Sequence, residues 1–143
     1  MKFAERTEAE PLSNDSQGCV QLPLGLLGFE QTKEFQLLAD PEEAPFAWLQ
    51  STQGAKLSFL IVDPFLVFPD YLPDISQEDA DFLGLQNPQD AVVFNIVTLR
   101  TAGSGSINLK GPIIINRRTR IAKQVIPLNA ATFQVQHPLP PAS

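Results

Sequence analysis

The sequence has little of the chemistry that most enzyme sites need. Its 143 residues include one cysteine, Cys19, and one histidine, His137, near opposite ends of the chain. Hydrolytic triads and zinc sites draw on several imidazole or thiolate groups, so these two residues build neither kind of site. We interpret His137, which precedes Pro138, as a bystander. We interpret Cys19 as a small core residue rather than a nucleophile, and expect no internal disulfide.

Other functional signatures are also missing. The chain has no GxxxxGK[ST] or GxGxxG nucleotide loop. Its apolar runs, such as SFLIVD, are far shorter than the ~18 residues that cross a bilayer, and no stretch has the pattern of a signal peptide. The acids of PDISQEDAD could serve as general acid and base, but a helix N-terminus explains them fully. We therefore expect a cytoplasmic protein that is not an enzyme and has no cofactor, metal or membrane partner.

Charge is divided unevenly along the chain. The net charge is -6, and no acid follows Asp90. Residues 1–90 carry 4 basic and 16 acidic side chains, a balance of -12, and residues 91–143 carry 6 basic ones, a balance of +6. If the halves stay apart, an acidic surface attracts a basic partner; if they interleave, much of the asymmetry cancels within a Debye length. The sequence leaves both arrangements open.

Short stretches of alternating apolar and polar residues dominate the sequence. Their β-branched and aromatic residues, bounded by Gly, Pro, Asn or Asp, predict strands. The predicted strands cover residues 46–51, 56–63, 91–100, 106–116, 120–128 and 131–137, with weaker candidates at 2–6 and 19–23. Thirteen prolines confine strands to short or kinked pieces. We predict a mostly β, small single-domain antiparallel β-barrel-like fold with one or two short helices and an extended, partly frayed tail at 138–143.

One helix is predicted from DISQEDADFLGL, with Ser76 as N-cap, Asp79 as its capping-box partner and Gly84 at the end. A second helical turn is predicted over residues 30–35. The run RTAGSGS (100–106) predicts an antiparallel hairpin. NRRT (116–119) predicts a tight turn, in which Asn116 either adopts a left-handed conformation or bonds its own backbone.

Basic residues concentrate in the stretch 105–128, which holds five of the ten Lys and Arg and no acid. Arginines at a hairpin tip are usually solvated turn residues, and recognition of an anion or an acidic partner is the alternative. Single-stranded nucleic acid needs aromatic side chains in the basic groove, and this stretch has none. We expect no direct nucleic-acid binding, and keep an RNA- or anion-binding barrel using the Arg117–Lys123 edge as a second hypothesis.

Five short motifs carry a resemblance to a known family. In order along the chain they are LPLGLLGFE, PFAWLQS, FLIVDP, INLKGPIIIN and RIAKQVI, within residues 22–128. On these motifs the chain resembles the flagellar assembly factor FliW family. The segment before residue 18 departs most from the family pattern, and Leu27 stands where the family usually has proline.

The resemblance implies a binding protein that is monomeric when free. Its implied partners are flagellin and CsrA, an RNA-binding translational repressor. The family holds CsrA off flagellin messenger RNA by allosteric contact away from the RNA surface, and new flagellin competes for the factor. A narrower version makes flagellin the main partner and the protein its chaperone. An acidic chain with Phe or Trp anchors has suitable electrostatics for a basic partner.

The matched motifs supply candidate positions for partner contact. They are Gln50, Ser51, Asp63, Pro64, Phe65, Phe68, Tyr71, Asn108, Leu109 and Pro112. The first four are expected at neighbouring strand ends, where they cap a loop or meet a partner. The prolines of DPFLVFPDYLPD predict an irregular surface with exposed aromatics. Asn108 either bonds neighbouring backbone in a kinked strand or contacts a partner.

Other motif residues are expected to be structural. They are Gly25, Gly28, Phe29, Ile115 and Asn116. The glycines permit a tight loop, and Phe29 is expected to fill the core. Phe46, Trp48 and Phe59 lie inside strand patterns, and both core packing and anchoring of a partner remain open for them.

Overall fold

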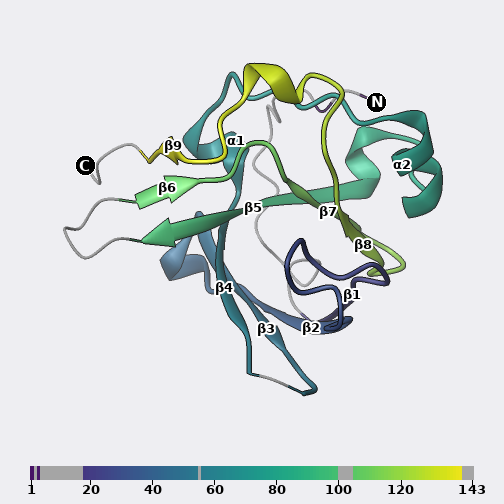
Figure 1. Cartoon of the computed structure of the whole chain (residues 1–143), viewed down its shortest axis with the longest axis vertical. Coiled ribbons are helices and arrows are strands. Elements are labelled where there is room, and N and C mark those ends of the chain that lie inside the picture. The colour runs from purple at the N-terminus through teal and green to yellow at the C-terminus, as the bar shows by residue number, and fades with distance from the viewer. Residues whose placement is uncertain (2, 4–17, 55, 100–104, 140–143) are drawn as a thin grey trace.

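The computed structural model describes residues 1, 3, 18–54, 56–99 and 105–139 (Figure 1). Its strands are β1 (Gly18–Gln21), β2 (Glu34–Leu38), β3 (Phe46–Ser51), β4 (Ser58–Val62), β5 (Ala91–Leu99), β6 (Gly105–Ile107), β7 (Ile113–Asn116), β8 (Ala122–Gln124) and β9 (His137–Pro138). Its helices are α1 (Pro64–Val67) and α2 (Gln77–Leu83), with 3-10 turns η2 (Pro41–Glu43), η3 (Pro88–Asp90) and η4 (Ala130–Thr132).

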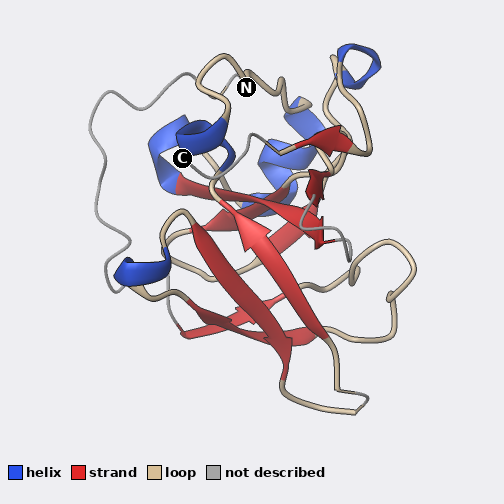
Figure 2. Cartoon of the chain, turned by 90° about the vertical axis from the view of Figure 1, so that its left-hand side faces the viewer, coloured by secondary structure: helices blue, strands red, loops and turns tan. Residues whose placement is uncertain are grey.

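Antiparallel ladders join the strands into one sheet, which confirms the mostly β prediction. The order is β1-β2-β3-β4-β5-β6-β9, and β7 pairs with both β5 and β8. Strand β5 crosses the middle of the molecule, and the β3–β4 and β5–β6 hairpins extend from it in different directions (Figure 1). Apart from the short η2, the helices gather at one end of the strands (Figure 2).

The barrel-like description fits the sheet loosely. Along the path β1-β2-β3-β4-β5-β7-β8, the two end strands meet at an isolated parallel bridge between Gln21 and Ile121. The Gln21 N–H donates to the Arg120 carbonyl at 2.9 Å. One bridge is not a ladder, so the sheet curls round without closing.

The curled sheet separates two apolar cores that share β5. Side chains alternate across a strand, so Val92 and Phe94 of β5 face one core, and Ala91, Val93 and Val97 face the other. The first core lies inside the curl and includes residues from β1, β2, β3, β4, β7 and β8. The second core is covered by α1, α2 and the chain after β8. Strand β5 is therefore buried on both faces along most of its length.

A bulge separates β6 from β7, which the sequence predicted as one kinked strand over 106–116. Ile107 pairs with Val97, and Ile113 pairs with Phe94. The Asn108 N–H still reaches Ile96 O at 3.0 Å. Residues 109–112 thus leave the ladder opposite one residue of β5. The Asn108 side chain accepts from Lys110 N at 3.0 Å, which confirms the predicted bond to neighbouring backbone.

Buried polar groups hold this bulge in place. The Tyr71 hydroxyl donates to Leu109 O at 2.7 Å. The Asn95 amide donates to Asn108 O at 2.8 Å and to the Tyr71 hydroxyl at 3.4 Å. Burial raises the pKa of Tyr71 well above its ordinary value, more than the Asn95 hydrogen bond lowers it. The phenol therefore stays protonated and remains a donor.

Helix α2 has the predicted N-cap and C-terminal glycine, but not the reciprocal capping-box bond expected of Asp79, whose carboxylate pairs with Lys123. The Ser76 side chain accepts from Asp79 N at 3.1 Å, and Gly84, at φ +69°, ends the helix. The predicted turn over residues 30–35 is wrong, because β2 begins at Glu34 and pairs with both neighbours. The structure instead places the short helix α1 at Pro64–Val67, where the sequence suggested irregular chain.

The ends of the described chain also differ from the prediction. The strand expected over 131–137 is mostly η4 and loop, and only His137 is paired, with Ile107 of β6. The predicted strand over 120–128 shrinks to β8. The weaker strand at 19–23 is confirmed as β1. The one at 2–6 lies outside the described residues except for Phe3. Of the tail predicted over 138–143, Pro138 is paired with Ser106 in β9, and residues 140–143 lie outside the described residues.

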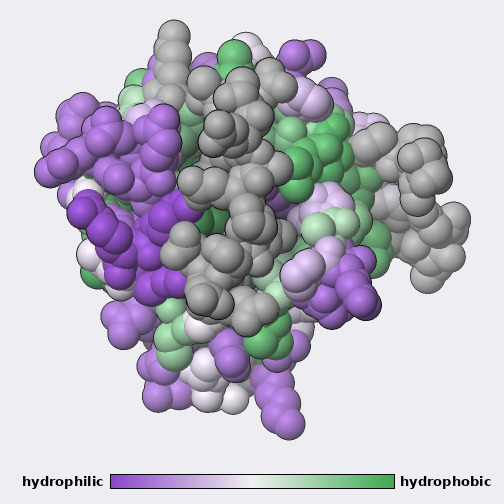
Figure 3. Space-filling model, turned by 180° about the vertical axis from the view of Figure 1, so that it is seen from behind, coloured by the Kyte–Doolittle hydropathy of each residue, from purple (hydrophilic) through white to green (hydrophobic). Residues whose placement is uncertain are grey.

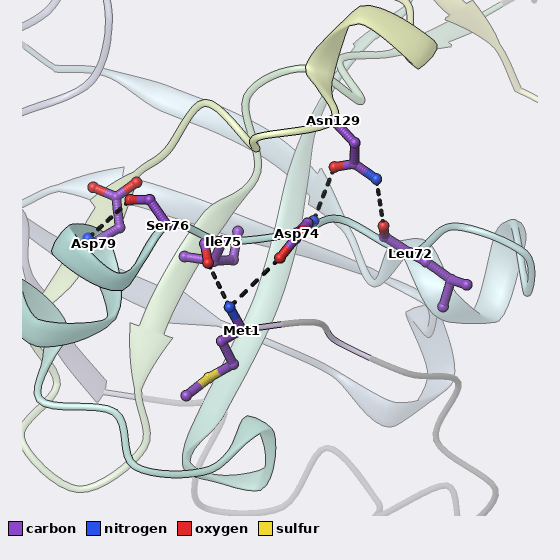
Figure 4. Close-up of polar contacts among 7 residues, drawn as sticks. All are labelled: Met1, Leu72, Asp74, Ile75, Ser76, Asp79 and Asn129. Atoms are coloured by element: carbon purple, nitrogen blue, oxygen red, sulfur yellow. Dashed lines mark hydrogen bonds and ion pairs between the residues drawn. The ribbon is translucent and has the colours of Figure 1, made fainter.

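Polar contacts tie the segment before α2 to the C-terminal part of the chain (Figure 4). The Asn129 amide accepts from Asp74 N and donates to Leu72 O, both at 2.9 Å. The Met1 amine donates to Ile75 O at 2.5 Å and lies 3.5 Å from the Asp74 carboxylate. These bonds satisfy backbone groups in a segment that belongs to neither a helix nor a strand.

We expect Tyr71→Phe to lower the free energy of unfolding by about 1–3 kcal/mol, because the buried Leu109 carbonyl loses its donor. Urea unfolding followed by circular dichroism measures this. Phe133→Leu is the control. It removes a ring whose centroid lies 4.8 Å from that of Tyr71 and leaves the hydrogen bonds of Tyr71 intact, so it measures the loss of packing alone. A Tyr71→Phe change below about 0.5 kcal/mol, the range of ordinary surface substitutions, would contradict the role given to the hydroxyl.

Candidate protein-binding surface

The strand-end residues predicted for partner contact do not come together. Strands β3 and β4 are antiparallel, with Gln50 opposite Ser58 and Phe46 opposite Val62. Ser51 and Asp63 therefore lie at opposite ends of the hairpin, and the expectation of neighbouring strand ends was wrong. The Ser51 hydroxyl accepts from Leu57 N at 2.9 Å in the connecting turn. Asp63 caps α1 by accepting from Phe65 N at 3.0 Å. Of the two roles predicted for it, capping the following segment or meeting a partner, the structure shows the capping role.

Most other predicted contact residues are buried. The exposed aromatic surface expected from DPFLVFPDYLPD was wrong for Phe65 and Tyr71, which are 8% and 3% exposed. Helix α1 directs Phe65 into the second core, and Tyr71, in the turn that follows the helix, packs there too, with the two ring centroids 6.1 Å apart. Phe68 is half-buried and packs edge-on against His137. Three further candidates are buried, namely Pro64, Leu109 and Pro112.

An apolar groove with an acidic end lies beside the β2–β3 connection, on the outer face of the sheet. We call it the Trp48 groove. Its volume is about 320 Å³, and its lining residues are Leu38, Ala39, Asp40, Glu43, Phe46, Ala47 and Trp48. Leu38 and Trp48 are directly paired across β2 and β3. They are 38% and 37% exposed, so each leaves a large apolar face in water.

The register of β3 explains why Trp48 points outward. Ala47 and Leu49 are buried in the first core, so residues 46, 48 and 50 face the other side. The sequence left open whether Phe46, Trp48 and Phe59 pack in the core or anchor a partner. Of these three, Trp48 is the exposed one. Phe46 and Phe59 are partly buried against the cores. Gln50, a predicted contact residue, shares the outer face with Trp48 and lies opposite Gln36 of β2.

The acidic end of the groove is supplied by η2. Asp40 caps this turn by accepting from Glu42 N at 2.9 Å. Glu43, at the end of η2, lines the groove beside it. The sequence analysis missed Leu38, Asp40 and Glu43, although the alternation in QLLAD before PEE would have indicated an outward Leu38.

The β1–β2 loop forms a second exposed apolar site. Phe29, expected in the core, is 40% exposed, because the loop turns it onto the outer part of Phe59 with ring centroids 5.2 Å apart. Leu24 and Leu27 are more exposed still. Gly25 has φ +69°, and a Cβ there would lie 2.5 Å from the Glu30 Cα, which confirms the predicted tight loop.

The basic hairpin is neutralised in part from within the protein. Lys123 forms an ion pair with Asp79 of α2 and lies 5.2 Å from the Phe82 ring centroid. Arg117 donates through its guanidinium to Ala91 O at 3.5 Å. Asn116 accepts from Arg118 N and Thr119 N, so it bonds its own turn, and Arg120 takes the left-handed conformation instead. The two charge halves thus interleave in space.

The remaining reactive side chains lie apart. Cys19, expected in the core, is exposed on β1, with its Sγ 4.0 Å from Glu34 Oε1. No group of three His, Cys, Asp or Glu side chains within the described ranges is placed to hold a metal ion. None of the helices drawn for these residues has the length and apolarity to span a membrane.

Exposed apolar side chains are spread over the surface. Seen from behind, hydrophilic side chains gather on the left and an apolar area lies at the upper right (Figure 3). What distinguishes the Trp48 groove is the combination of aromatic surface, a hollow and carboxylates. Such a combination suits the binding of another protein.

Comparison with known proteins agrees with this architecture. A solved structure described as "Crystal structure of the flagellar assembly factor FliW" superposes with a TM-score of 0.78 and 32% identity, covering 100% of this chain and 99% of that one. The sequence model of the family "FliW protein" matches residues 4–139. The chain belongs to the FliW family. This identification confirms the resemblance carried by the five sequence motifs.

Relatives in the FliW family span several kinds of bacteria. A flagellar assembly factor FliW of Leptospira biflexa is 40% identical over 114 residues, which cover 78% of this chain and 74% of the relative. The FliW of Bacillus subtilis is 37% identical over 116 residues, 80% of each chain. Both similarities extend over most of the fold described above.

Asp90 provides a test of how the acidic and basic halves meet. Its carboxylate accepts from Gln86 N and Asn87 N, each at 3.0 Å. These bonds, and then the charges of Arg118 and Arg117, lower its pKa below the ordinary value of 3.8. A carboxylate with a lowered pKa stabilises the fold above its unfolded pKa, and this stability is lost as the pH falls through the folded pKa.

We therefore expect Asp90→Asn to lower the melting temperature at pH 7, with the gap to wild type closing as the pH drops below about 4. Melting temperatures from pH 7 to pH 2 measure this. Asp70→Asn removes an exposed carboxylate elsewhere and serves as the control. A gap for Asp90→Asn that stays constant down to pH 2 would show that the charge contributes nothing.

Proposed function

We propose that this chain is a non-enzymatic flagellar assembly and regulatory factor of the cytoplasm. It binds the translational regulator CsrA, relieves repression of flagellin messenger RNA, and binds flagellin in a partner switch. Its FliW membership supports the flagellar role, since its relatives are named flagellar assembly factors. The contact with CsrA is non-competitive and lies away from the surface that binds RNA.

The observation that carries the proposal is the sign of the exposed charge. Among the described residues, seven acids are exposed: Glu30, Asp40, Glu42, Glu43, Asp70, Glu78 and Asp81. Only three bases are equally exposed: Lys33, Lys56 and Arg118. Because the basic hairpin is engaged in part within the protein, the surface that the described residues offer to a partner is mainly acidic. Such a surface attracts a basic RNA-binding protein and repels nucleic acid.

The test is isothermal titration calorimetry with CsrA of the same organism, at about 50 and about 300 mM salt, where exposed charges are screened to different degrees. We expect submicromolar binding that weakens at the higher salt, and displacement of CsrA when flagellin is added. Absence of binding to CsrA would overturn the proposal. Binding of flagellin alone would favour the narrower role as a flagellin chaperone.

The second candidate function, RNA or anion binding along Arg117–Lys123, makes a separate prediction. It requires a mobility shift of flagellin leader RNA that falls steeply with salt and disappears in Arg117→Glu with Arg118→Glu. We expect no shift with the wild-type protein, because Lys123 is paired with Asp79 and Asp90 lies near both arginines. A salt-sensitive shift lost in the double variant would favour this candidate instead.

A further inference from the structure

The Trp48 groove has a composition that selects its occupant. Most of its lining is apolar and includes the exposed faces of Leu38 and Trp48, together with Ala39 and Ala47, which are themselves buried. One end carries the carboxylates of Asp40 and Glu43, and no basic side chain is among the described residues that line it. An anion would be repelled from this groove, and an uncharged apolar group would leave two carboxylates to be desolvated without a partner. The groove therefore suits a cation with an apolar body.

The carboxylates remain available to such a cation. Asp40 uses Oδ1 to accept from Glu42 N, which leaves its second oxygen for a further donor. The Glu43 side chain has no hydrogen bond or ion pair to any described residue and is exposed to solvent. The rigid β2–β3 ladder and the η2 turn fix both residues at the end of the groove.

Arginine fits this arrangement better than lysine. Its planar guanidinium stacks on an indole and binds a carboxylate with two parallel N–H groups, whereas the lysine ammonium is a compact and strongly hydrated charge. The groove offers both surfaces at once, the Trp48 ring and the Asp40–Glu43 pair. Leu60, opposite Trp48 on β4 and half-buried, extends the apolar surface for a neighbouring aliphatic side chain.

We propose that the Trp48 groove is a receptor for an arginine side chain presented by a basic protein segment, with the guanidinium held between Trp48 and the carboxylates of Asp40 and Glu43. This inference rests on the proposed function only for the identity of the protein that supplies the arginine. The groove is then the place where the regulator docks, and its chemistry accounts for a preference among basic partners.

The single tryptophan makes the groove directly observable. Trp48 is the only Trp of the chain, so its fluorescence reports this groove alone. The probes are two peptides that contain no Trp or Tyr and have a central Leu. Arginines flank the Leu in the first peptide, and lysines flank it in the second. We expect the arginine peptide to shift Trp48 emission to the blue, protect it from acrylamide, and bind at least about threefold tighter than the lysine peptide.

Variants locate the interaction. We expect Glu43→Gln to weaken the arginine peptide about two- to fivefold, the range for one exposed ion pair, and Trp48→Ala to weaken it more, as measured by calorimetry. Glu78→Gln on α2 and Leu66→Ala on α1 are the matched controls for charge and apolar surface, and we expect both to bind like wild type. Circular dichroism checks that each variant is folded.

The outcomes separate the two proposals. Equal affinity for both peptides would overturn the arginine site. So would Trp48 emission that does not change up to about 1 mM peptide, a concentration at which even weak binding is detected. CsrA binding that is unchanged in Trp48→Ala and Glu43→Gln would overturn the groove as its docking place and leave the proposed function standing. Binding of the arginine peptide without any binding of CsrA or flagellin would support the site and overturn the function.

Discussion

The burial of β5 on both faces is the constraint on which the rest of the structure depends. One strand contributes side chains to two cores and pairs with β4, β6 and β7. Such a strand tolerates few polar residues, because a buried polar group without a hydrogen bond is costly. Asn95 is the exception on β5. Its position opposite the bulge gives its amide N–H groups the Asn108 carbonyl and the Tyr71 hydroxyl as acceptors, while its Oδ1 has no hydrogen-bond partner among the described residues.

The bulge in turn determines how the two halves of the chain meet. Residues 109–112 leave the ladder, so β6 and β7 form two hairpin partners of β5 in place of one long strand. Strand β7 then carries β8 and the basic turn to α2, where Lys123 meets Asp79 and Asn116 donates to Leu83 O at 2.7 Å. Internal neutralisation of the basic segment is thus a result of topology, and it leaves the acids of η2 as charge available to a partner.

Local signals in the sequence predicted the local structure well. Strand β3 matches its predicted bounds, and α2 begins and ends at the residues that its caps indicated. Failures arose where tertiary packing decided the outcome. The prolines of the segment 64–73 suggested exposure, but helix α1 and the turn after it bury Phe65 and Tyr71. Phe29 has an apolar side chain in a tight loop, and nothing in the sequence shows that the loop lies across Phe59 at the surface.

The candidate site was predictable only in kind. Composition indicated an acidic binding protein with aromatic anchors, and the strand pattern around Trp48 was compatible with either face. Which face is buried depends on the pairing of β3 with β2 and β4, and the groove depends on how η2 folds back beside the strands. These are non-local features. The sequence alone therefore named Gln50, which shares the outer face with Trp48, and missed the carboxylates that line the groove with Trp48.

A single side chain connects the β1–β2 loop to the bulge. The Gln124 amide accepts from Leu27 N at 2.9 Å and donates to Gly111 O at 3.1 Å. A proline at position 27 would have no N–H to give, so the carboxamide oxygen at position 124 would lose this donor. Across the family, positions 27 and 124 should therefore covary, with glutamine at 124 retained most strictly where residue 27 is not proline.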